Sequence, residues 1–170
     1  MAKHILLPAK AITDAEQSNA IVVSFAATWH QHLLAEDFSL VIRKRVPKSR
    51  TFEWLYFHIN SPVSAICGRA QIETIANLMT EQAIRRASKI NLPPEEIKSY
   101  IAGDRHIGCY KLGAFQFGNK PVHTTELATR MIYHPPQSFF ILSKLGKQIL
   151  DRMAGFIQLK AGHSRNAQNK

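Results

Sequence analysis

The sequence has few cysteines and no long apolar run. Cys67 and Cys109 are the two cysteines in 170 residues, which excludes a disulfide framework, and both lie in apolar, strand-like stretches where we expect buried thiols. The apolar stretch at 20–27 is far too short to span a bilayer. Pro8 and Lys10 interrupt the apolar start of the chain, which argues against a secretory signal. We therefore expect a soluble, cytoplasmic protein.

Acidic residues are also scarce. The chain has 12 Asp and Glu against 22 Lys and Arg, a formal net charge of +10. Because 45% of the residues are hydrophobic and only 20% are charged, the chain is not a disordered basic tail and can fill one core. An excess of positive charge in a compact domain favours a polyanionic partner, nucleic acid first of all.

The motifs of most cofactor and metal enzymes are missing. The sequence contains no Cys-x-x-Cys, His-Glu-x-x-His, P-loop, Gly-x-Ser-x-Gly or Gly-x-Gly-x-x-Gly. His30 and His32 are two residues apart on a predicted helix, so their side chains diverge and do not chelate one ion. His106 and Cys109 fall on opposite faces of a predicted strand. We therefore predict neither a cofactor nor a metal site.

Hydrophobic periodicity predicts strands separated by a helical insertion. The predicted strands are 20–25, 39–46, 52–60, 63–75, 107–117 and 139–142, with a weaker candidate within 121–131. The predicted helices are a short one from Thr13, 28–35, one from Thr80, one from Pro94, and a last helix capped by Ser143. Their inward candidates are Trp29, Leu33 and Leu34 in 28–35, Ile97 and Ile101 in the helix from Pro94, and Leu145, Ile149, Met153 and Phe156 in the last helix. This order indicates an α+β fold, a small, mostly antiparallel β-barrel with flanking helices.

Basic residues are densest at the end of the second predicted strand. Five cations lie within eight residues: Arg43, Lys44, Arg45, Lys48 and Arg50. Concentrated positive charge repels itself and is relieved by phosphates, so nucleic-acid contact is one interpretation and a solvated sheet edge is the other. The helix from Thr80 adds Arg85, Arg86 and Lys89 on its polar side.

Aromatic residues follow the basic segment directly. Trp54, Tyr56 and His58 alternate along a strand and share one face, with Leu55, Phe57 and Ile59 on the other. Exposed rings beside cations would form a platform for base stacking. The alternative is that the aromatic run belongs to the core.

Several short motifs give the chain a family resemblance. Arg43–Lys48, Ser61-Pro62-Val63, Ile66-Cys67-Gly68 and Pro135–Phe139 occur in the order seen in the ASCH family of the PUA-like superfamily, and the chain resembles bacterial and phage members described as predicted transcriptional regulators. The resemblance covers about residues 21–145 as one domain. It leaves an N-terminal extension with a short helix (1–20), a C-terminal helix packed on the domain (146–160) and a flexible basic tail (161–170).

The resemblance implies a β-barrel with a cleft that binds RNA, and some members act as amidohydrolases on acetylated cytidine or as ribonucleases. The family signature Gly-x-Lys-x-x-Glu-x-Arg, with Thr for Glu in the amidohydrolases, is reduced here to Arg43, because Glu36, Phe38 and Val41 occupy the Gly, Lys and Glu or Thr positions. Phenylalanine and valine do not transfer protons, so the resemblance favours binding over catalysis.

We therefore predict a nucleic-acid-binding protein, with RNA favoured over DNA and a role in transcription regulation left open. The predicted binding residues are Arg43, Lys44, Arg45, Lys48, Arg50, Trp54, Tyr56, His58, Ser61, Arg85, Arg86, Lys89, Gln137 and Ser138. The alternatives are a hydrolase of RNA or a modified nucleoside with a rearranged set such as Lys44, His58 and Glu81, and a module that binds an acidic protein.

Overall fold

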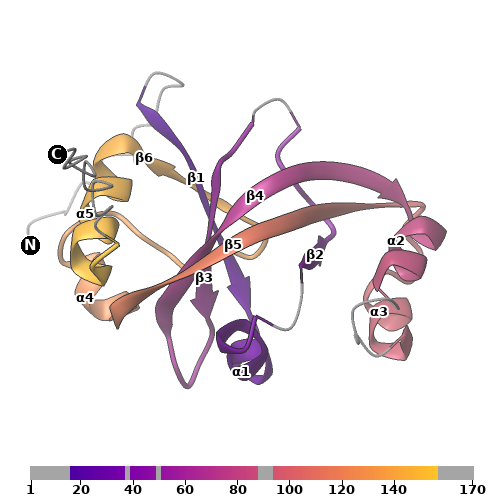
Figure 1. The fold of residues 1–170 in the computed structure, drawn as a ribbon, viewed down its shortest axis with the longest axis horizontal. Coiled ribbons are helices and arrows are strands. Elements are labelled where there is room, and N and C mark those ends of the chain that lie inside the picture. The colour runs from indigo at the N-terminus through magenta and orange to yellow at the C-terminus, as the bar shows by residue number, and fades with distance from the viewer. Residues whose placement is uncertain (1–15, 37–38, 49–50, 88–93, 157–170) are drawn as a thin grey trace, which may run out of the picture.

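The computed structural model describes residues 16–36, 39–48, 51–87 and 94–156 (Figure 1). The strands are β1 (Gln17–Phe25), β2 (Leu40–Arg43), β3 (Trp54–Ile59), β4 (Ala65–Met79), β5 (His106–His123) and β6 (Phe140–Ser143). The helices are the short η1 (Ala27–Trp29), α1 (His30–Leu34), α2 (Thr80–Ala87), α3 (Pro94–Tyr100), α4 (Thr124–Ala128) and α5 (Lys144–Ala154). The predicted short helix from Thr13 and the basic tail lie outside the described residues.

The six strands form one open sheet in the order β2-β5-β4-β3-β1-β6. β1 and β3 run parallel, and the other neighbouring pairs run antiparallel. The fold is α+β with a mostly antiparallel sheet, as predicted. The barrel expectation needs correction, because β2 and β6 end the sheet without pairing to each other.

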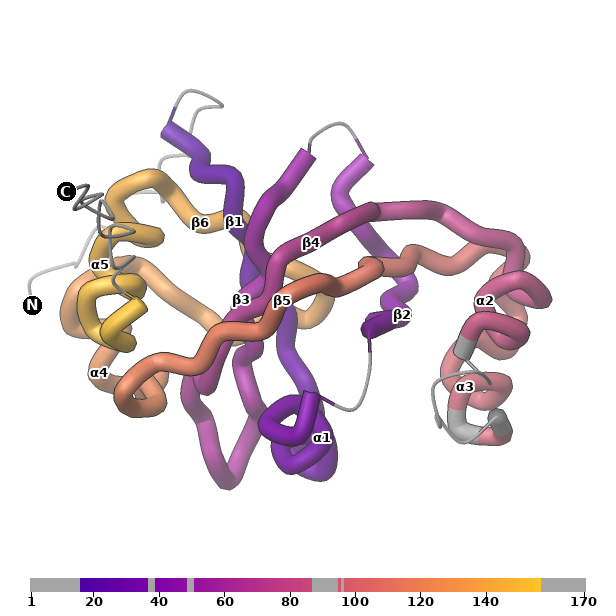
Figure 2. The backbone as a smooth tube through the Cα atoms, viewed as in Figure 1, coloured from indigo at the N-terminus to yellow at the C-terminus, as the bar shows by residue number. Residues whose placement is uncertain are grey.

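Alternation along the central strands builds a core on each face of the sheet. Leu55, Phe57 and Ile59 pack on one face with Leu33 of α1, while Trp54 and Tyr56 pack on the other with residues of α4 and α5. The predicted alternation of β3 is confirmed. Figure 2 shows β4 and β5 running side by side across the molecule, from α4 and α5 at one end to α2 and α3 at the other.

A third core lies at the α2–α3 end. It joins Leu40 and Ile42 of β2, Ala83 of α2, Ile97 of α3 and Ile101, which follows that helix. The predicted core positions Ile97 and Ile101 are confirmed. This cluster fixes β2 and the chain that follows it beside the two helices.

Three details of the first half and of the 121–131 segment differ from the predictions. β2 ends at Arg43 rather than at residue 46. Leu34 is 45% exposed, although we expected it to face inward with Leu33. The weak strand candidate within 121–131 is instead the end of β5 followed by α4, which begins at Thr124.

Ser143 caps α5 as predicted, since its hydroxyl accepts a hydrogen bond from the Gly146 N–H at 2.9 Å. The predicted inward stripe is confirmed at Phe156, which is buried, and at Met153, which packs against the second core, but it is wrong at Leu145, which is 66% exposed. The buried residues within the helix are Gly146, Leu150 and Ala154. Small residues face the sheet because the backbones approach closely, and a Cβ on Gly118 of β5 would lie 2.2 Å from the Ala154 carbonyl oxygen. Within the described ranges, every helix is too short or too polar to cross a membrane.

Candidate nucleic-acid interface

Arg43, the first cation of the basic segment, is turned into the protein. Its guanidinium donates to the Ile42 carbonyl at 2.7 Å and to the Ser24 carbonyl at 2.8 Å, and it lies 4.6 Å from the centroid of the Phe25 ring. Burial lowers the pKa of Arg43, although a guanidinium stays charged at any physiological pH. Arg43 therefore connects β2 to β1, and we correct its predicted role in phosphate binding.

Lys44 contacts the helical insertion. Its ammonium lies 3.1 Å from an Asp104 carboxylate oxygen and 5.7 Å from the centroid of the Tyr100 ring. The Lys44 backbone N–H donates to the Tyr100 hydroxyl at 3.3 Å. Arg45 and Lys48 follow with exposed side chains, while Arg50 lies outside the described residues. The cations exposed here are thus Lys44, Arg45 and Lys48.

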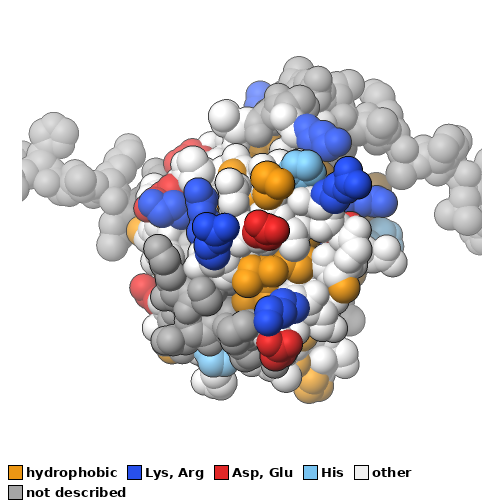
Figure 3. Space-filling model, turned by 90° about the vertical axis from the view of Figure 1, so that its right-hand side faces the viewer, with side chains coloured by type: hydrophobic (Ala, Val, Ile, Leu, Met, Phe, Trp, Pro, Cys, Tyr) orange, Lys and Arg blue, Asp and Glu red, His pale blue; other side chains and the backbone are white. Residues whose placement is uncertain are grey.

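Helix α2 adds basic residues to the same end of the molecule. Ala83 is buried in the third core, and Arg85 and Arg86 are exposed, with Arg85 at 4.0 Å from Glu81 one turn earlier. Lys89 lies outside the described residues. Figure 3 looks onto this end and shows Lys and Arg side chains around an apolar patch, with acidic side chains among them. We call the exposed cations of these two segments, Lys44, Arg45, Lys48, Arg85 and Arg86, the cationic face.

The aromatic platform predicted from Trp54, Tyr56 and His58 is wrong. Their exposed fractions are 4%, 0% and 1%, so a base has no access to these rings. Trp54 and Tyr56 belong to the core between the sheet and α5, which is the alternative that the sequence left open.

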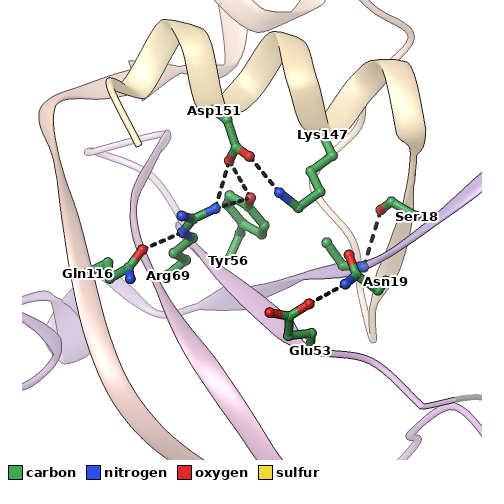
Figure 4. Close-up of polar contacts among 9 residues, drawn as sticks. Ser18, Asn19, Glu53, Tyr56, Arg69, Gln116, Lys147 and Asp151 are labelled. Atoms are coloured by element: carbon green, nitrogen blue, oxygen red, sulfur yellow. Dashed lines mark hydrogen bonds and ion pairs between the residues drawn. The ribbon is translucent and has the colours of Figure 1, made fainter. Parts of the chain in front are cut away.

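Instead, Trp54 and Tyr56 lie against a buried arginine, Arg69, and Figure 4 shows its contacts with Tyr56 and Asp151. The Arg69 guanidinium lies 4.1 Å from the Trp54 ring centroid and 4.7 Å from that of Phe156. It pairs at 3.0 Å with Asp151 of α5, which also accepts a hydrogen bond from the Tyr56 hydroxyl. Burial, followed by the Asp151 charge, raises the pKa of Tyr56 well above its usual value. This ion pair joins α5 to the sheet.

His58 lies in a second buried polar group. Its Nε2 is 3.0 Å from the Thr124 hydroxyl, which donates to the Ser64 carbonyl at 3.0 Å, so Nε2 carries the proton. Nδ1 then accepts from the Ser24 hydroxyl, at 3.4 Å. Burial lowers the pKa of His58, and the imidazole is neutral at pH 7. This arrangement satisfies a core histidine, and it excludes direct ligand contact as long as the ring stays buried.

The remaining predicted residues are spread over the surface. Ser61 and Gln137 are exposed and Ser138 is half-buried, and no contact described here joins them to the cationic face. Val41, at the family's Glu or Thr position, is 3% exposed in the first core, and Phe38 lies outside the described residues. A valine packed in the core supplies no acid or base.

Sequence reasoning missed Arg69 and Tyr100. An arginine in the middle of an apolar strand was the available signal for Arg69, since such a charge needs a buried partner. Tyr100 gave no signal, because its position beside Lys44 depends on how α3 packs against β2.

Comparisons with known proteins identify the fold. No family model and no curated protein matches the chain. Three solved structures of the ASCH protein from Zymomonas mobilis share its fold. A serine-to-alanine variant has a TM-score of 0.74 at 19% identity, covering 81% of this chain and 98% of that one. A tyrosine-to-phenylalanine variant has 0.73 at 20% identity, covering 80% and 99%, and the unsubstituted protein has 0.72 at 20% identity, covering 79% and 95%.

Proposed function

We propose that this chain, which has the fold of the Zymomonas mobilis ASCH protein, binds nucleic acid through the cationic face, with RNA favoured over DNA. The preference for RNA follows from analogy with PUA-like proteins. A role in regulating transcription would be one use of such binding.

One observation carries the proposal: two basic segments far apart in the sequence adjoin elements that share one hydrophobic core. Lys44, Arg45 and Lys48 follow β2, while Arg85 and Arg86 come from α2, and the third core holds these two elements together. Phosphate contacts by Lys and Arg supply most of the affinity of non-specific binding. Because each phosphate contact releases counterions, we expect binding that falls as the salt concentration rises.

The test is a salt titration of RNA binding by the variant Arg45→Ala/Lys48→Ala. Each lost phosphate contact lowers the slope of log K against log salt by about 0.7 for single strands, so losing two lowers it by about 1.4. Arg43 is left intact, because replacing it would also remove its contacts with the Ser24 and Ile42 carbonyls.

Lys120→Ala/Arg130→Ala is the matched control. It removes the same charge near α4, at the opposite end of β5. An equal loss of affinity in both double variants would show that net charge, rather than the cationic face, governs binding. An unchanged slope in Arg45→Ala/Lys48→Ala would refute the proposal.

The hydrolase alternative loses its candidate set. Lys44 pairs with Asp104, His58 is buried against Thr124, and Glu81 lies beside Arg85 on α2. Each therefore has different neighbours, and no contact among the described residues joins them into one site.

A further inference from the structure

We infer that Tyr100 is the surface on which an unpaired base stacks, and that the ligand of the cationic face is a single-stranded nucleic acid. The inference rests on the proposed function and deepens it, because it specifies the form of nucleic acid that is bound.

Tyr100 is an aromatic ring that the structure presents beside exposed cations. It ends α3, is 43% exposed, and lies against the first residue after β2. Phe117 of β5 is 38% exposed, but its ring packs on Phe115 and covers Gly68. Among the described Phe, Tyr and Trp residues, these two have the most exposed side chains, and Tyr100 is the one that contacts Lys44 of the cationic face.

The Tyr100 ring is held in place before any ligand arrives. Its hydroxyl accepts the Lys44 N–H, and the Lys44 ammonium lies near the ring while paired with Asp104. A ring already fixed by its neighbours loses little side-chain freedom when a base stacks on it, which increases the net gain from stacking.

The cations beside the Tyr100 ring suit a flexible single strand of nucleic acid. Arg45 and Lys48 lie one and four residues beyond Lys44, so their side chains can follow a backbone whose base contacts Tyr100. In the interior of a duplex, bases are stacked on their neighbours and the ring would meet none of their faces. Proteins that bind single-stranded nucleic acid combine a groove of basic residues with aromatic rings in this way.

The experiment measures fluorescence anisotropy of two labelled RNAs at low salt, a short oligouridine and a blunt duplex of equal length. We expect wild type to bind the oligouridine more tightly than the duplex. Tyr100→Leu should weaken oligouridine binding about 5- to 100-fold and leave duplex binding unchanged. Tyr100→Phe keeps the ring but loses the hydrogen bond from the Lys44 N–H, so it should bind oligouridine more tightly than Tyr100→Leu does.

Phe117→Leu is the matched control, an exposed ring away from the cationic face, and it should leave both affinities unchanged. If wild type binds oligouridine and Tyr100→Leu binds it equally well, or if Tyr100→Leu weakens both RNAs alike, the inference is refuted while the proposed function stands. If wild type binds neither RNA, the proposed function fails and this inference with it. Thermal unfolding of Tyr100→Leu verifies that the variant is folded, as expected for a residue this exposed.

Discussion

Replacing Asp151 by alanine tests the buried ion pair that joins α5 to the sheet. The side chain of Arg69 is 2% exposed and that of Asp151 is 21% exposed. Removing one partner of a buried pair costs about 3–5 kcal/mol, because the remaining charge stays buried without compensation. Since Asp151 is partly reached by water, we expect the lower limit, about 3 kcal/mol.

The assay is urea unfolding at pH 7, with Glu126→Ala as the matched control. Glu126 pairs with Lys120 at 3.3 Å, but the two side chains are 42% and 59% exposed, so its loss should cost at most about 1 kcal/mol. In a thermal scan, the Asp151→Ala change corresponds to a fall of about 6–12 °C in Tm.

Two results would refute this reasoning. One is a decrease in the free energy of unfolding of Asp151→Ala that is no larger than the decrease in Glu126→Ala. The other concerns Arg69→Met/Asp151→Leu, which removes both charges and should be more stable than Asp151→Ala. If the double variant is the less stable of the two, the uncompensated charge is not the cause of the loss.

Two further predictions concern His58 and the approach of α5. Because burial lowers the pKa of His58 below its usual value near 6.5, the unfolded chain takes up a proton that the folded chain resists, and the free energy of unfolding should fall as pH drops below 6.5. His58→Gln should reduce this pH-dependent fall in the free energy of unfolding by up to about 1.4 kcal/mol per pH unit. If urea unfolding gives the same pH profile for wild type and His58→Gln, the lowered pKa of His58 is contradicted. Gly118→Ala should lower the free energy of unfolding by about 1–3 kcal/mol, because its Cβ would lie 2.2 Å from the Ala154 carbonyl oxygen. Gly113→Ala on the same strand would meet the movable Glu73 side chain and should cost less, so equal losses would speak against the close approach.

The fold was largely readable from the sequence where periodicity reflects burial. The alternation through β3, the core positions Ile97 and Ile101, and the Ser143 cap are confirmed. The first position of the α5 stripe, Leu145, was predicted wrongly because hydrophobicity favours large side chains, whereas the small Gly146 and Ala154 are buried and Ala154 lies against Gly118 of β5.

The candidate site was less predictable, because the role of a charge or a ring depends on residues distant in sequence. Arg43 appears equivalent to Arg45 in the sequence, yet its guanidinium reaches carbonyls on β1 and β2. Trp54 and Tyr56 have the composition of a stacking platform, and the partner they enclose, Arg69, comes from the neighbouring strand. Tyr100 acquires its position only through packing against Lys44.

The length of β4 and β5 has a mechanical consequence. Pairing of β3 with β4 ends at Gln71, so the rest of β4, to Met79, extends beyond the central strands as an arm with β5 and β2. Register shifts between Ala70 and Ile72 and between Ile72 and Thr74 fall at the base of this arm, where bulges bend a ribbon and interrupt its ladder. The arm thus carries Arg85 and Arg86 beyond its end, and it is joined to the central strands both by this irregular stretch and by Arg43, which reaches the Ser24 carbonyl of β1.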